Sequence, residues 1–145
     1  MIPQLNNLVN IGKLKSEPFS RQEFDGLVRS GAVRLKDAES KTLQIESRFD
    51  LAYNAAHALS LAALRSHDLR SENRYLVFQC LEHTLGLPAE HWRVLELAHR
   101  KRNVAEYAGE FEIDESLMES LIRVTREIHR RVIAIKGNPP ATGAS

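Results

Sequence analysis

The sequence predicts an all-α fold, a four-helix up-and-down bundle with an N-terminal accessory helix. Two observations support this prediction. Apolar residues recur at spacings of three and four along most of the chain, which is the pattern of helices with one buried face. Segments that alternate polar and apolar residues, as half-buried strands do, are not evident in the sequence, and neither is a hairpin turn.

Composition narrows the class of protein. The 145 residues suffice for one domain with a buried core, and 43% hydrophobic and 27% charged residues are ordinary for a soluble protein. The net charge of +1 argues against tight non-specific binding to duplex nucleic acid, which needs many clustered cations. A single cysteine, Cys80, excludes an internal disulfide. The sequence shows no signal peptide and no apolar run of the ~20 residues that span a bilayer, so we expect a cytoplasmic protein without membrane contact.

The sequence divides into three parts. Residues 1–19 are expected to form an irregular arm, because Pro3 and Pro18 interrupt it. The arm carries enough apolar residues to dock onto a bundle or a partner. Residues 20–136 form a single helical domain, and 137–145, rich in proline, glycine and alanine, form a disordered tail.

The first helices of the domain have recognisable signals. Ser20 and Glu23 match a capping box, which starts a short helix that Ser30-Gly31 ends. Neither glycine nor proline occurs in 32–67, so the simplest expectation is one long central helix there. Its many alanines allow other helices to approach closely.

Three more helices are expected after this one. Ser71 is expected to cap a helix at 71–85. Pro88 suits the first turn of the next helix, which runs to about Tyr107. Asp114 caps the last helix, whose apolar stripe extends to about Ile135.

The end of the Pro88 helix carries the most informative polar residues. They recur at the i, i+3, i+4 and i+7 spacing of one continuous stripe, and a phenol, Tyr107, follows. The stripe consists of His99, Arg102, Asn103 and Glu106. A cation, an amide, a carboxylate and a phenol on one face can hold a phosphate and a nucleobase. The same face is also compatible with a solvated surface, with a polar seam in a dimer, or with an ion pair between Arg102 and Glu106.

Metal and nucleotide-loop motifs are weak or missing. The six histidines are dispersed, and Glu96 and His99 give one Glu-x-x-His match where a di-metal bundle needs two. The glycines are isolated, so a glycine-rich phosphate loop is not predicted. We therefore expect neither a metal ion nor a cofactor. His57, which alanines flank, is interpreted first as a core or seam histidine and second as a residue of the site.

Two segments together resemble one family. Residues 48–59, around Tyr53 and His57, and residues 102–107 resemble the corresponding helices of HEPN (higher eukaryotes and prokaryotes nucleotide-binding) domains, in particular of a small bacterial subfamily. The resemblance covers roughly 32–135. It implies a small all-α bundle of HEPN type, of which many form homodimers.

The resemblance bears on catalysis as well. Many HEPN proteins are metal-independent ribonucleases whose motif is an arginine, four to six further residues and a histidine. Arg102 matches this arginine and Asn103 the polar residue that often follows, but Tyr107 stands where a histidine is expected. A tyrosine with a pKa near ~10 is a poor base at neutral pH. The resemblance therefore implies a nucleotide-associated fold more than it implies an enzyme.

Other HEPN groups resemble helper bundles that pair with nucleotidyltransferases, and some are modified with AMP on a tyrosine, for which Tyr107 is the candidate here. The favoured hypothesis is a homodimeric binding or regulatory module that binds nucleotide or RNA and pairs with a nucleotidyltransferase in a toxin–antitoxin or defence-type system. One alternative is a ribonuclease that uses Arg102 with His57 or His99 as the base. The other is a helical interaction protein without a ligand.

Overall fold

Helices dominate the structure, as the sequence predicts. A computed structural model describes residues 2–108 and 113–137, with only the backbone described at 105–108, 136 and 137. The long helices are α2 (Arg21–Ala38), α3 (Ile45–Arg65), α6 (Ala89–Ala108) and α7 (Glu115–Gly137). The short ones are α1 (Pro3–Asn10), α4 (Arg74–Gln79) and α5 (Leu81–Thr84). Two short strands, β1 (Lys15–Ser16) and β2 (Leu69–Arg70), pair antiparallel, which the sequence did not indicate.

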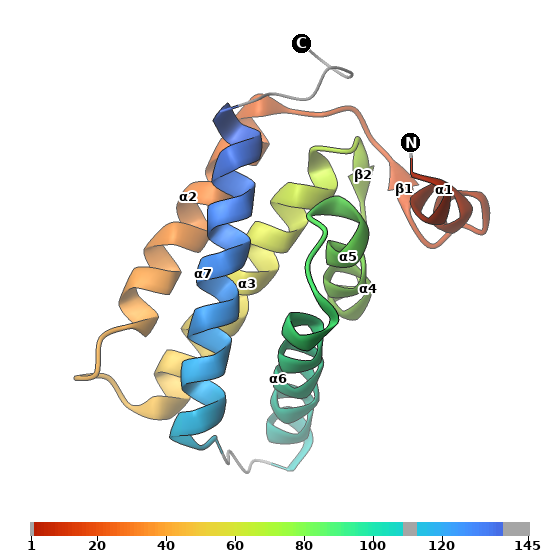
Figure 1. Cartoon of the computed structure of the whole chain (residues 1–145). Helices are drawn as coiled ribbons and strands as arrows, with labels where there is room; N and C mark the ends of the chain where they lie inside the picture. The colour runs from red at the N-terminus through yellow and green to blue at the C-terminus, as the bar shows by residue number, and fades with distance from the viewer. Residues whose placement is uncertain (1, 109–112, 138–145) are drawn as a thin grey trace.

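The main core lies where α2, α3 and α7 pack against one another (Figure 1). Helix α6 contacts α7 and α4, and α4 also contacts α3. Large buried side chains fill the core, among them Phe24, Phe49, Leu59, Met118 and Ile128. Within the described residues, every helix is too short or too polar to cross a membrane.

The expected long helix at 32–67 is wrong, because the chain turns between α2 and α3. Gly31 does not end a helix; it lies inside α2, where a Cβ would come within 2.5 Å of the Leu59 side chain. The glycine is therefore a close-packing position between the two helices. The break comes after Ala38, whose carbonyl accepts a 2.9 Å hydrogen bond from Nε of buried Arg48.

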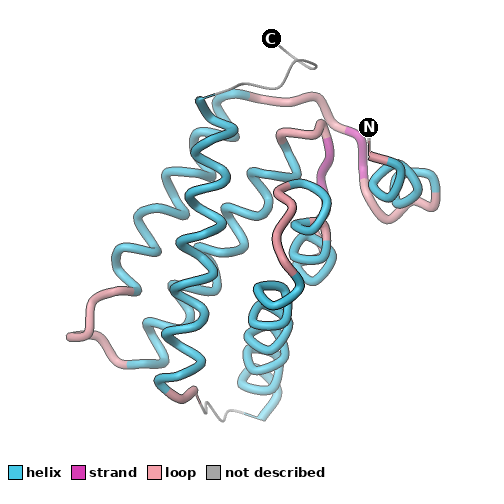
Figure 2. The backbone as a smooth tube through the Cα atoms, in the orientation of Figure 1, coloured by secondary structure: helices cyan, strands magenta, loops and turns pink. Residues whose placement is uncertain are grey.

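The expected irregular arm at 1–19 also needs correction, because it contains α1 and β1 (Figure 2). Apolar residues of the arm build a second core cluster, in which Leu5 packs with Leu64 and other residues of α3, α4 and β2. At the turn before β2, Asp68 adopts a φ of 59°. Its carboxylate accepts a 2.8 Å hydrogen bond from the backbone N–H of Phe19, which fastens the end of the arm.

The predicted helix caps have mixed outcomes. Ser20 accepts a hydrogen bond from the Glu23 N–H at 3.2 Å, and Asp114 accepts one from the Leu117 N–H at 2.7 Å, so both caps are confirmed. The Ser71 cap is wrong: Asn73 caps α4, and the expected helix at 71–85 is two short helices. Residues 109–112 and the predicted tail from 138 onward lie outside the described residues.

An ionic group around the buried Arg65, here called the Arg65 cluster, joins the arm to the bundle. It consists of Arg65, Arg70, Glu17 and Glu23. Arg65 is 1% exposed and donates to the Glu23 carboxylate at 2.6 Å and to the carbonyls of Glu17 and Pro18 at 2.8 and 2.5 Å. Arg70 donates to the carboxylates of Glu17 and Glu23. Glu23, expected to reach back to its own helix start, binds these arginines instead.

Candidate functional site

Helices α3, α4 and α6 bring polar side chains together around the buried ring of Tyr53. Helix α3 supplies residues at the i, i+3, i+4 and i+7 spacing, so they share one face: Asp50, Tyr53, Asn54 and His57. Helix α6 supplies His99, Arg102 and Asn103 of the predicted stripe, and α4 supplies Arg74. We call this group the Tyr53 site.

A hydrogen-bonded chain links the two helices. The Tyr53 hydroxyl lies 2.9 Å from Nδ1 of His99, and Nε2 of His99 lies 3.2 Å from the Asn103 side-chain amide nitrogen. The rings of Tyr53 and His99 also stack, with centroids 6.3 Å apart. Because both ring nitrogens are engaged, the imidazole of His99 has a fixed orientation.

Two guanidinium groups lie against the Tyr53 ring. The Arg102 guanidinium is 4.8 Å and the Arg74 guanidinium 5.6 Å from the ring centroid, both within cation–π range. Arg74 also donates to the Asn54 side-chain oxygen at 2.9 Å. The two cations thus come from different helices and converge on one aromatic ring.

The carboxylate of Asp50 lies at the outer edge of the site. Oδ1 of Asp50 lies 3.9 Å from Nε of Arg102, and the Asp50 side chain is 61% exposed against 24% for Arg102. A long, solvent-facing ion pair of this kind contributes little to stability. Asp50 therefore moderates the positive charge of the site without enclosing the arginine.

Tyr53 and His57 are both neutral at pH 7. Burial raises the pKa of Tyr53, and the nearby Arg102 and Arg74 oppose this effect only in part, so the phenol keeps its proton. Burial, with Arg74 and Arg102 adding to it, lowers the pKa of His57 to about 4. Nε2 of His57 is buried and has no hydrogen-bond partner among the described residues. A neutral imidazole is thus held beside two guanidinium groups.

Aromatic rings form the wall behind His99. Tyr75 lies 5.3 Å from His99 and 5.5 Å from Trp92, and Phe78 meets Tyr53 edge-on at 5.6 Å. These rings exclude water from one side of the imidazole, which strengthens polar interactions there.

The structure brings some of the predicted site residues together and does not describe the side chains of others. His99, Arg102 and Asn103 lie together in the Tyr53 site, and His57 lies on the facing helix. The side chains of Glu106 and Tyr107 lie outside the described residues. The polar cluster includes Tyr53 and Arg74, which sequence reasoning did not select. The four-residue spacing of Tyr53 and His57 was a usable signal, whereas nothing near Arg74 in the sequence indicates its contact with α3.

The described residues contain no group of three or more His, Cys, Asp or Glu side chains placed to hold a metal ion. Comparison with known proteins adds no assignment, because no family model, no curated protein and no solved structure matches the chain. Function must therefore be inferred from the chemistry of the site.

Proposed function

We propose that the chain is a module that binds nucleotide or RNA phosphate at the Tyr53 site. The observation that carries this proposal is the convergence of Arg74 and Arg102, from two helices, on the ring of Tyr53. Guanidinium groups bind phosphate through charge-assisted, often bidentate hydrogen bonds. An arginine held over an aromatic ring loses less freedom when it binds, because its position is already restricted.

The neighbouring groups suit the rest of a nucleotide. Asn54 and Asn103 carry amides that can pair with a base or a ribose, and the half-buried Tyr75 offers a ring for stacking. Nε2 of His57 is a neutral ring nitrogen without a partner among the described residues, and it can accept a hydrogen bond from a hydroxyl.

The HEPN resemblance supports the same proposal. The two segments that carry it, 48–59 and 102–107, contribute Tyr53 and Arg102, which are in contact. We extend the proposal to a four-helix up-and-down bundle of HEPN type with an N-terminal accessory helix. The proposed assembly is a homodimer whose Tyr53 sites face one cleft, paired with a nucleotidyltransferase in a toxin–antitoxin or defence-type system. Intact mass after coexpression with the genomic neighbour tests this assembly, including AMP attachment at Tyr107.

Fluorescence anisotropy with a labelled short oligoribonucleotide tests binding. Replacing Arg74 or Arg102 by Ala is expected to weaken binding by about tenfold or more, since a charge-assisted hydrogen bond contributes ~1.5–3 kcal/mol. Arg100→Ala is the matched control. It removes the same charge from α6, the helix of Arg102, at a side chain that is 67% exposed and pairs with Glu96. Equal affinities for all three variants would contradict the proposal.

A metal-independent ribonuclease is the second candidate, because the unpartnered Nε2 of His57 lies in the same site as Arg102. With a pKa of about 4, His57 is a weak proton acceptor, and both ring nitrogens of His99 are already hydrogen-bonded. These two facts favour binding over catalysis. RNA cleavage in EDTA that disappears in both Arg102→Ala and His57→Gln would reverse this preference, and binding without cleavage would support the module.

A further inference from the structure

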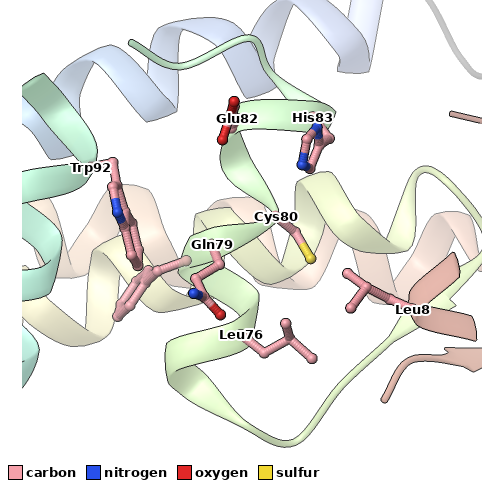
Figure 3. A pocket seen from close by; sticks show the side chains of 8 residues that line it. Leu8, Leu76, Gln79, Cys80, Glu82, His83 and Trp92 are labelled. Carbon is pink, nitrogen blue, oxygen red and sulfur yellow. The ribbon is translucent and has the colours of Figure 1, made fainter. Parts of the chain in front are cut away.

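A second concave site lies on the other side of Phe78, between the N-terminal arm and helices α4, α5 and α6. It has a volume of about 280 Å³. Its lining consists of Leu8, Leu76, Phe78, Gln79, Cys80, Glu82, His83 and Trp92 (Figure 3). This volume lies near the lower end for small-molecule pockets, so it suits a compound with one ring.

The lining of this pocket combines apolar, aromatic and charged side chains. Leu8 and Leu76 are apolar, and Phe78 and Trp92 contribute aromatic rings. Glu82 adds a carboxylate and His83 an imidazole, and the lining, all of it within the described residues, includes neither lysine nor arginine. Burial raises the pKa of Cys80 to about 11, so its thiol stays neutral and behaves as a small apolar group.

We propose that this pocket binds a small organic cation, a protonated or quaternary amine on a single-ring body. The body would pack against Leu8 and Leu76, where apolar surface leaves water. The cation would lie near the aromatic rings, whose faces attract positive charge, and Glu82 would balance it. An anion would meet the Glu82 carboxylate without a fixed cation in the lining to offset it.

The pocket depends on the arm and is independent of the Tyr53 site. Leu8 belongs to α1, so the wall it supplies exists only while the arm is docked. Phe78 reaches both places, but Arg74, Arg102 and His99 do not line the pocket. Loss of RNA binding and loss of amine binding are therefore separable outcomes.

Trp92 provides the readout, because it lines the pocket and is the single tryptophan of the chain. The full-length protein would be titrated with phenethylamine, and with 2-phenylethanol and 3-phenylpropionate as neutral and anionic analogues of similar size. The amine is expected to change Trp92 fluorescence with an affinity several-fold higher than that of the alcohol, and the acid is expected to bind most weakly. Equal affinity for amine and alcohol, or no change with the amine, would overturn the proposal.

Two variants that change the charge of the lining test whether the amine binds in this pocket. Glu82→Gln is expected to weaken amine binding by about three- to fivefold, the range of an exposed ion pair. Gln79→Lys, which adds a like charge at an exposed lining residue, is expected to weaken it by about tenfold. Neither change should alter alcohol binding. Glu46→Gln, an exposed carboxylate of α3 outside the lining, is the matched control. Amine binding that both lining variants leave unchanged would place the ligand elsewhere and overturn the proposal.

Discussion

The Arg65 cluster and the Tyr53 site both place arginines against α3, but they use them differently. Arg65 is 1% exposed, and its guanidinium donates to one carboxylate and to backbone carbonyls at 2.5 to 3.2 Å. Arg102 is 24% exposed, lies over the ring of Tyr53 and approaches Asp50 at 3.9 Å. A buried arginine that donates to a carboxylate and to backbone carbonyls holds the fold together, whereas a partly exposed arginine over an aromatic ring can meet an external anion.

The largest expected difference is in stability. Arg65→Met should lower the free energy of unfolding by about 3–5 kcal/mol, because it removes the side-chain donor of the Glu17, Pro18 and Leu69 carbonyls and leaves the Glu23 carboxylate paired with Arg70 alone. Arg102→Met should cost about 1 kcal/mol or less, the range of a partly exposed cation–π contact. Urea unfolding followed by circular dichroism measures both. Similar losses for the two variants would remove the distinction drawn here.

The next difference is in pH dependence. Folding keeps the His57 pKa at about 4, below its usual 6.5, so the unfolded chain takes up this proton first. Stability is therefore full above pH 6.5 and falls by up to about 3 kcal/mol as the pH drops to 4. Burial raises the pKa of Glu23, but hydrogen bonds from Arg65 and Arg70 outweigh this and the pKa lies below 4.5. Its contribution is present above pH 4.5 and is lost as the pH falls through the folded value.

Acid titration of stability should thus show two stages. His57→Gln should reduce the upper stage, to which His67 also contributes because burial lowers its pKa too. Glu23→Gln should reduce the lower one. Urea midpoints between about pH 7 and pH 3 for the wild type and both variants would resolve the two stages. If His57→Gln leaves the size of the upper stage unchanged, the Tyr53 site does not hold a neutral histidine.

The smallest expected effect concerns Asp50. Asp50→Asn should leave stability almost unchanged, since the ion pair with Arg102 is long and exposed. The same change should raise affinity for the oligoribonucleotide by about two- to fivefold, because it removes a like charge beside the phosphate. Glu46→Gln, near the start of the same helix, controls for a general change in net charge. Weaker binding in Asp50→Asn would show that the carboxylate itself takes part in recognition.

Helix type and several caps were predictable because their causes are local. Ser20 and Asp114 act within three residues of themselves, and the apolar spacing identifies the buried faces. Gly31 was wrongly predicted to end a helix, because the reason for a glycine there is the close approach of Leu59 on the facing helix. The helix and strand of the arm were not predicted, because the order of the arm depends on contacts between residues far apart in the sequence. The hydrogen bond between Asp68 and Phe19 is one of these contacts.

The Tyr53 site, too, could be predicted only where its residues lie close together in the sequence. The spacing of His99, Arg102 and Asn103 marks one helix face, and the structure places these residues together. Arg74 joins them through α4, a short helix whose placement depends on tertiary packing. A pattern within one helix can select half of such a site, but the residues on the facing helices depend on how the chain folds back.

The rate at which the Cys80 thiol reacts can report how often the arm undocks. It is buried in the second core cluster, burial raises its pKa to about 11, and it is the one cysteine of the chain. A thiol reagent therefore reacts at a single position, and because Cys80 is 1% exposed, a reagent too large for the 280 Å³ pocket that it lines reacts only after local opening. Comparing that rate with the rate for the denatured chain gives the free energy of local opening. The protein thus carries its own reporter of how often the arm lifts away from the bundle.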